Sequence, residues 1–241
     1  MKRTRIFKIA ALSFVMLIAL NLGISATANI FQQGKVRNLP EFNELNLGIS
    51  AEVYLKQGSV QKVEIQASDK YLQLIETEVK GKSLQIKWTE RNVSCSEKIK
   101  IYITMVDVNA IRISGSGDIY TEGTISTSSI DLAISGSGNI NIGDLRTENI
   151  SSAISGSADI NINGSNIVGK MTAAISGSGN IKAQDLPVKN VEVTISGSGD
   201  CKVNALETLQ ARIAGSGDIY YKGKATIDGK VSGSGSIKHI D

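Results

Sequence analysis

The sequence predicts an all-β fold, a parallel β-helix (β-solenoid), and three observations lead to this prediction. First, a motif with the commonest form Ile-Ser-Gly-Ser-Gly-Asp/Asn-Ile occurs seven times. The copies start at Ile113, Ile134, Ile154, Ile175, Ile195, Ile213 and Val231, at intervals of 18 to 21 residues. Second, segments of alternating apolar residues precede the copies. Third, glycine and serine supply frequent turns. A fixed period of this length is typical of coils that stack on one another.

The alternation before each motif indicates strands with one buried face. Examples are Ile130–Ile134 and Val191–Ile195, in which every second residue is apolar. The same parity places Ile134, Gly136, Gly138, Ile140 and Ile142 on the inner face and Ser135, Ser137 and Asn139 on the outer face. We expect the inner glycines either to allow close approach of the opposite wall or to provide a turn with positive φ.

Coils of 18 to 21 residues also match the length of leucine-rich repeats, but the spaced leucines and asparagine of that repeat are missing. In a β-helix, equivalent positions of successive coils lie about 4.8 Å apart. We therefore predict one buried column that contains Ile140, Ile160, Ile181 and Ile219, with Cys201 among them.

The outward positions of the motifs form the candidate site, a polar ladder that runs along the stack. Its members are Ser114, Ser116, Asp118, Ser135, Ser137, Asn139, Ser155, Ser157, Asp159, Ser176, Ser178, Asn180, Ser196, Ser198, Asp200, Ser216 and Asp218. Two carboxylates about 4.8 Å apart repel by roughly 3–4 kcal/mol at an effective dielectric constant of ~20. Asn separates the Asp residues in the first five copies, and only Asp200 and Asp218 are direct neighbours. This alternation predicts a hydrogen-bonded ladder.

The N-terminal residues 1–28 have the features of a cleavable secretory signal peptide. Four basic residues precede an apolar run from Ile9 to Leu20, and residues 26–28 form an Ala-Thr-Ala cleavage site. An uncleaved membrane anchor is the alternative, but the apolar run is short for a spanning helix. Cleavage removes the four basic residues and no acidic one, so the formal net charge falls from +3 to −1. This charge gives no support to a nucleic-acid-binding role, so no nucleic-acid partner is expected, and contact with a membrane is expected only during export.

The mature chain, residues 29–241, is predicted to form one solenoid domain. Residues 111–241 hold the seven coils, and residues 36–110 lack the motif but contain further alternating segments such as Ile49–Leu55 and Ile99–Ile103. A solenoid must cover its terminal edges, so we expect residues 36–110 to form an N-terminal cap. Its large residues, Tyr54 and Trp88, are expected to fill the core.

Together, the exported N-terminus, the stretch from Ile49 through Trp88 and the seven motifs resemble a bacterial family, the putative auto-transporter adhesins with a head GIN domain. The resemblance covers roughly residues 45–240. It implies an exported β-helical domain with a role in adhesion, and it brings no catalytic motif.

The residues needed for catalysis or metal binding are scarce. His239 is the only histidine, and it lies near the C-terminus, which disfavours a catalytic triad or a multi-histidine metal site. Cys201 occupies an inward position and is expected to be a buried thiol, whereas Cys95 lies in a polar loop, so a disulfide is not favoured. The Asp spacing does not fit the calcium-binding nonapeptide repeat. No cofactor or metal is predicted.

These residues leave three classes of function to consider. A polysaccharide-active enzyme is disfavoured because Arg112 and Arg212, the candidate basic residues, would lie about 24 Å apart at 4.8 Å per coil. A binding module for carbohydrate or a surface protein is predicted, because solenoids commonly bind along extended faces. A non-enzymatic scaffold of the cell envelope is the alternative. An aromatic platform would favour binding, but Tyr120, Tyr220 and Tyr221 are the only aromatic residues of the repeats and are widely spaced. The ligand and the oligomeric state are left open.

Overall fold

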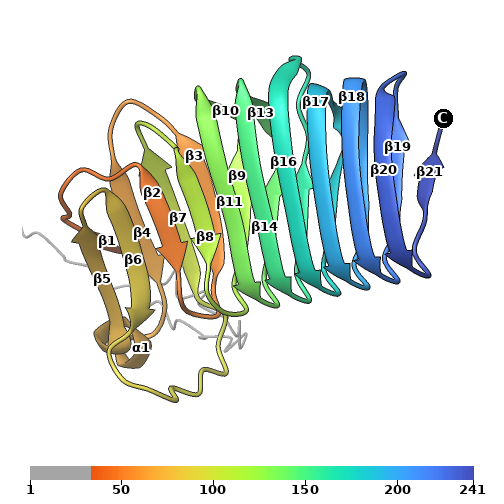
Figure 1. The fold of residues 1–241 in the computed structure, drawn as a ribbon. Coiled ribbons are helices and arrows are strands. Elements are labelled where there is room, and N and C mark those ends of the chain that lie inside the picture. Colours follow the sequence, from red (N-terminus) through yellow and green to blue (C-terminus); the bar gives the residue numbers. More distant parts are fainter. Residues whose placement is uncertain (1–33) are drawn as a thin grey trace, which may run out of the picture. The chain divides into compact units, whose positions relative to one another are not determined.

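The computed structural model describes residues 34–241, and these residues form a parallel β-helix (Figure 1). In each coil a strand of the first wall leads into the Gly-Ser-Gly turn, and a strand of the second wall follows. The first wall contains β8 (Ala110–Ile113), β11 (Ser129–Gly136), β14 (Asn149–Gly156), β16 (Val168–Gly177) and β20 (Thr226–Gly233). The second wall contains β9 (Asp118–Glu122), β12 (Asn139–Ile142), β15 (Asp159–Ile162), β19 (Ile219–Lys222) and β21 (Ile237–His239).

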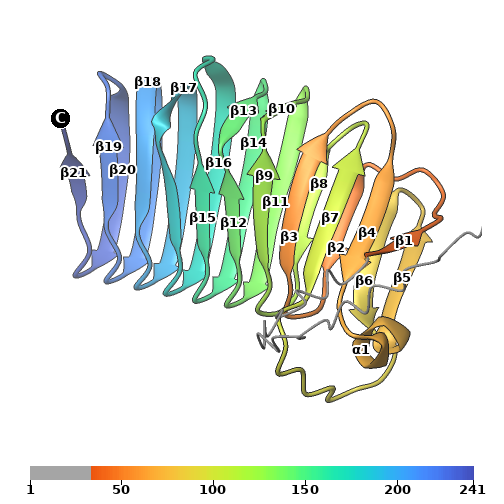
Figure 2. The ribbon, with the colours of Figure 1, turned by 180° about the vertical axis from the view of Figure 1, so that it is seen from behind.

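Two long strands take part in both walls. β17 (Asn180–Gly197) and β18 (Cys201–Gly215) each begin in the second wall and end in the first. Two short strands, β10 (Thr124–Ser126) and β13 (Asp144–Arg146), pair with each other between the walls of successive coils. Figure 2 shows the second wall from its outer side.

The register confirms the predicted stacking of equivalent positions. Ile134 aligns with Ile154, and this column continues through the other motifs of the first wall. In the second wall, Ile140, Ile160, Ile181, Cys201 and Ile219 align, and all five are fully buried. The inward parity read from the sequence is therefore correct.

The two motif glycines have different roles. The first one adopts positive φ from Gly136 onward, for example 136° at Gly156. A Cβ atom on Gly156 would also lie 2.2 Å from the carbonyl oxygen of Gly136 in the preceding coil. The second glycine has no positive φ, and Ala158 replaces it in one coil. The atoms that approach the glycine turn most closely thus belong to the adjacent coil and not to the opposite wall.

Residues 36–110, predicted to be a cap, contain two further coils. β2 (Glu44–Leu47) and β3 (Glu52–Gln57) pair in parallel with β8 and β9, so that the segment Leu47–Val53 occupies the place of a motif. β6 (Ser83–Trp88) and β7 (Lys100–Met105) form a coil beyond it. The glycines of the motif are absent from both coils, and only the alternation of apolar residues remains.

The end of the stack is covered by antiparallel strands. β5 (Ile75–Lys80) pairs with β6, β4 (Lys62–Gln66) pairs with β7, and β1 (Lys35–Arg37) pairs with β4. The helix α1 (Asp69–Leu74) links β4 to β5, and the ring of its Tyr71 packs against Trp88 at 6.2 Å between centroids. Trp88 thus contributes to the core of this end, as expected.

Tyr54 does not fill the core, which contradicts its predicted role. It lies between Val53 and Leu55, which are both fully buried, and so it points outward. The predicted signal peptide, residues 1–28, lies outside the described residues. Within residues 34–241, no helix has the length and apolar character needed to cross a membrane.

Candidate functional site

The outward positions of the motifs, which the sequence analysis proposed as the candidate site, form exposed serine rows and one half-buried column of Asp and Asn. Ser135 and Ser137 and their equivalents in the other coils are exposed at the tight turns, which line up along one edge of the stack (Figure 1). Ser114 donates a hydrogen bond from its hydroxyl to Asn46 at 3.3 Å. Most of the other ladder serines present their hydroxyls to solvent as a repetitive polar edge.

Hydrogen bonds connect the Asp and Asn column from coil to coil. The amide of Asn139 donates to Asp118 at 2.7 Å, and the carbonyl oxygen of Asn139 accepts from the backbone N–H of Asp159 at 3.3 Å. The same pair of bonds recurs at Asn180, whose amide donates to Asp159 at 2.8 Å and whose oxygen accepts from Asp200 at 3.1 Å. The column therefore uses most of its polar atoms internally, which limits its capacity to bind a ligand.

Asp200 and Asp218 are neighbours in the column, and their carboxylates accept different hydrogen bonds. Asp200 accepts from the backbone N–H of Asp218 at 2.8 Å. Asp218 accepts from the hydroxyl and N–H of Ser236 and from Lys238 at 3.0 Å, and these bonds lower the pKa of Asp218 well below its usual range. Among residues 34–241, no three His, Cys, Asp or Glu side chains gather closely enough to hold a metal ion.

A stack of tyrosines on the second wall was missed by the sequence analysis. The parallel register brings Tyr102, Tyr54 and Tyr120 into one column on β7, β3 and β9. The ring centroids of Tyr54 and Tyr102 are 5.3 Å apart with 17° between the planes, and those of Tyr54 and Tyr120 are 5.9 Å apart with 25°. Tyr54 thus has a ring neighbour on each side, whereas Tyr102 and Tyr120 each stack on Tyr54 alone.

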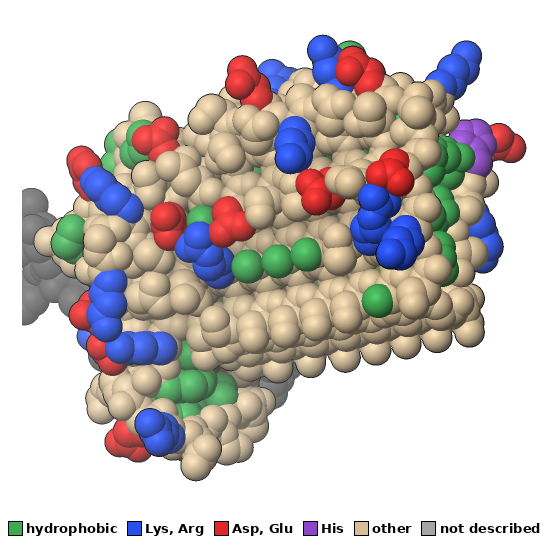
Figure 3. Space-filling view, in the orientation of Figure 1, with side chains coloured by type: hydrophobic (Ala, Val, Ile, Leu, Met, Phe, Trp, Pro, Cys, Tyr) green, Lys and Arg blue, Asp and Glu red, His purple; other side chains and the backbone are tan. Residues whose placement is uncertain are grey.

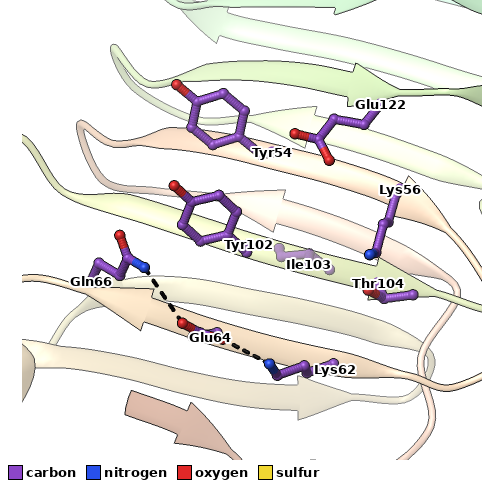
Figure 4. A pocket seen from close by; sticks show the side chains of 9 residues that line it. All are labelled: Tyr54, Lys56, Lys62, Glu64, Gln66, Tyr102, Ile103, Thr104 and Glu122. Carbon is purple, nitrogen blue, oxygen red and sulfur yellow. Dashed lines mark hydrogen bonds and ion pairs between the residues drawn. The ribbon is translucent and has the colours of Figure 1, made fainter. Parts of the chain in front are cut away.

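A pocket of about 300 Å³ lies beside this stack (Figure 4). Tyr54 and Tyr102 form one flank, and the polar side chains of β4 form another. Across the pocket from the rings lie Lys56, Thr104 and Glu122, as the close-up shows. The pocket therefore combines an aromatic surface with hydrogen-bond donors and acceptors, which can contact a polar ligand.

Short contacts hold two of the side chains that line the pocket, Glu64 and Tyr54. Glu64 accepts a hydrogen bond from Lys62 at 2.7 Å, which lowers the pKa of the Glu64 carboxyl. Burial raises the pKa of Tyr54, and the hydrogen bond that its hydroxyl donates to Glu52 at 3.1 Å raises it further. At neutral pH the carboxyl of Glu64 is therefore ionised, and the hydroxyl of Tyr54 keeps its proton and donates.

The first wall carries a shallow apolar groove of about 570 Å³, seen in Figure 3 as a row of small apolar side chains. Its floor includes Ala133, Ala153 and Ala174, which align with Arg112 in one column of the sheet. Arg112 binds Glu44 and Asp131, each at 2.7 Å. The arginine is thus held in ion pairs at one end of the groove.

The second candidate arginine lies in the same column but far along the stack. Arg212 aligns with Thr194, which in turn aligns with Ala174. Four other coils therefore lie between the coil of Arg112 and the coil of Arg212. It pairs with Asp228 at 2.6 Å. As the sequence predicted, the two arginines lie too far apart to share one site. Near the C-terminus, Nε2 of His239 lies 3.0 Å from the carbonyl oxygen of Gly223.

Both cysteines are free thiols. Cys201 is fully buried, and this burial raises its pKa to about 12, so that the thiolate is not formed at neutral pH. Cys95 is half-buried, and its sulfur lies 3.4 Å from the carbonyl oxygen of Glu97. Cys201 is therefore a packing residue, as its inward position predicted.

Comparison with known proteins decides the family. The model of the family described as "Putative auto-transporter adhesin, head GIN domain" matches residues 41–225. The chain belongs to this head GIN domain family. The matched range includes the tyrosine pocket, the groove and the Asp and Asn column as far as Asp218.

Solved structures share the fold of this head GIN domain. A putative adhesin from Bacteroides fragilis NCTC 9343 is 29% identical with a TM-score of 0.81, over 86% of this chain and 96% of that one. A putative lipid binding protein from Parabacteroides distasonis ATCC 8503 is 25% identical with a TM-score of 0.71, over 87% and 96%. A putative adhesin from the same Parabacteroides strain, 22% identical with a TM-score of 0.72, shares the fold. No curated protein matches the chain.

Proposed function

We propose that this head GIN domain is an exported, non-enzymatic binding module of the cell envelope or cell surface, and that it acts in adhesion. The family and the Bacteroides fragilis neighbour are both described as putative adhesins. The features of residues 1–28 support export through a cleavable signal peptide. The observation that carries the proposal is the aromatic pocket on the rigid second wall.

The fold suits this role because it fixes the pocket in place. The residues of the pocket sit on β3, β4, β7 and β9, which pair continuously through their backbones. Because the backbone of these strands is already ordered, ligand binding requires no ordering of the backbone, which favours affinity. An adhesive surface needs such a preformed site.

Two other functions fit the described residues less well. A polysaccharide-active enzyme needs convergent carboxylates and a basic residue, and the two candidate arginines are separated by four coils and held in ion pairs. A scaffold without a ligand gives no role to a pocket that combines two tyrosine rings with exposed lysine and glutamate side chains. A binding module gives the pocket a role and does not require the two arginines to converge.

Two measurements test the proposal on cells that produce the protein. Mass spectrometry of the mature protein is expected to place the new N-terminus after Ala28. Fractionation followed by protease treatment of intact cells is expected to show cleavage of the exposed protein. A protein that retains residues 1–28 in the cytoplasm contradicts export, and a fully protected periplasmic pool contradicts adhesion.

A further inference from the structure

We infer that the tyrosine pocket binds a neutral sugar unit of a glycan. This inference rests on the proposed function, because it names the ligand class of the same surface. Three properties of the pocket lead to it: the exposed aromatic surface, the sum of its charges and the position of its free polar groups.

The aromatic surface fits the apolar face of a pyranose ring. Tyr120 is 38% exposed, and Tyr54 and Tyr102 are half-buried, so that the column presents a ring surface to solvent instead of hiding it in the core. The C–H groups on one face of a sugar pack against an aromatic ring, and the hydroxyls at its rim stay free to form hydrogen bonds. The ring of Tyr102 stacks on Tyr54 alone, so its side toward β4, which faces the pocket, is left for such a contact.

The charges around the pocket cancel, which favours an uncharged ligand. Lys56 and Lys62 contribute two positive charges, and Glu64 and Glu122 contribute two negative ones. An acidic glycan would meet the two carboxylates, and a cationic ligand would meet the two ammonium groups. A neutral hexose or an N-acetylated hexosamine avoids both repulsions.

The free polar groups match the hydroxyls of a sugar. Lys62 and Glu64 are engaged with each other at 2.7 Å. Lys56 and Glu122 face each other in the register of β3 and β9 but form no ion pair in the part of the chain that the structure describes, so both can contact a ligand. Lys56 supplies donors, Glu122 supplies acceptors, and the hydroxyl of Thr104 supplies both. Neighbouring sugar hydroxyls donate and accept in the same way, so these three side chains complement a diol (Figure 4).

The experiment uses the mature protein and a panel of neutral trisaccharides of glucose, mannose, galactose and N-acetylglucosamine. A galacturonic acid trisaccharide is the charged comparison. Saturation-transfer NMR detects binding, and titration calorimetry measures the dissociation constant. At least one neutral trisaccharide is expected to bind, and the acidic one is expected to bind at least ~tenfold more weakly.

Two variants locate the site. Tyr102→Ala removes part of the aromatic surface, and Thr104→Gln fills the space between the lysines while it leaves the rings in place. Both are expected to weaken binding by at least ~tenfold. Tyr220→Ala is the matched control, because Tyr220 lies in the same outward column at the other end of the wall and outside the pocket. It is expected to leave binding within ~twofold of the parent. Circular dichroism and melting curves check that each variant is folded.

The possible results test the ligand class and the proposed adhesive function independently of each other. Loss of binding in both pocket variants, with Tyr220→Ala unchanged, supports the inference. Neutral trisaccharides that bind equally well to the folded Thr104→Gln variant overturn the site. If no neutral trisaccharide binds while beads coated with the protein still attach to host-matrix or cell surfaces, the ligand class is wrong and the adhesive function stands. If the beads do not attach but a trisaccharide binds at the pocket, the adhesive function is wrong and the inference stands.

Discussion

The substitution Asn139→Asp tests whether the Asp and Asn column is a structural ladder or a metal site. In the parent, Asn139 donates to the Asp118 carboxylate at 2.7 Å and accepts from the backbone N–H of Asp159. The variant loses the donor and places two carboxylates at this short distance. The acceptor toward Asp159 is retained, so the damage is confined to one side of the residue.

The expected cost follows from these contacts. A hydrogen bond to a charged acceptor contributes about 1.5–3 kcal/mol, and the lower end applies because Asp118 and Asn139 are only half-buried. Repulsion between partly solvated carboxylates adds about 1 kcal/mol, which salt reduces. We therefore expect a loss of about 2–3 kcal/mol in the free energy of unfolding. This corresponds to a decrease of roughly 4–12 °C in Tm for a chain of this size.

The assay is thermal unfolding of parent and variant in millimolar calcium and in chelator, at low and high sodium chloride. The ladder predicts a parent that does not respond to calcium and a variant that salt partly rescues. Asn141→Asp is the control, because the Asn141 side chain acts as an acceptor for Asn161 at 2.7 Å and a carboxylate keeps this role. A parent whose Tm rises by many degrees in calcium would falsify the ladder, since only a site that binds the ion in the folded state gives such a rise.

Three further predictions concern the stability of the coils. Gly156→Ala combines positive φ with a Cβ atom 2.2 Å from the neighbouring carbonyl oxygen, and it is expected to lower the free energy of unfolding by about 3–5 kcal/mol. Ala158→Gly in the same turn is expected to lower it by only about 1 kcal/mol. Urea unfolding measures both effects, and equal values would contradict the distinct roles of the two positions. Ile160→Asp buries an unpaired charge in a fully buried column and should cost at least about 4 kcal/mol, and a variant that melts like the parent would refute the inward assignment. Asp218 has a lowered pKa in the folded state, so its stabilising contribution is complete above its unfolded pKa near 3.8 and is lost as the pH falls toward its folded value. The Tm of Asp218→Asn is therefore expected to fall less steeply than that of the parent below pH ~4, and parallel curves would contradict this role of Asp218.

The repeated half of the fold was predictable because each coil repeats the same physical constraints. The alternation around Ile140 indicates which side chains face the core, and the seven copies of the motif define the register between coils. The alternation of Asp and Asn indicates the hydrogen bonds between neighbouring coils, which are present at Asn139 and Asn180. Local pattern and stacking agree throughout this half.

The N-terminal half was less predictable because the order of its coils in space differs from their order in the chain. The coil of β6 and β7 follows that of β2 and β3 in sequence but lies on the far side of it from β8 and β9. The segment of β4, α1 and β5 intervenes and hides the period. Tyr54 was assigned to the core by its size, although its parity relative to Val53 points outward. Its partners Tyr102 and Tyr120 come from segments whose register the sequence does not display.

The location of the pocket follows from the limits of a regular repeat. Identical coils present identical side chains at each step, and in this chain the outward Asp and Asn residues bind mainly one another. A site for a particular ligand needs different side chains in neighbouring coils. The coils of β3 and β7 depart from the motif and provide Tyr54, Lys56, Tyr102 and Thr104, and the first motif-bearing coil adds Glu122. The regular coils hold the wall in register, and the irregular coils next to the cap provide the chemical variety that recognition requires.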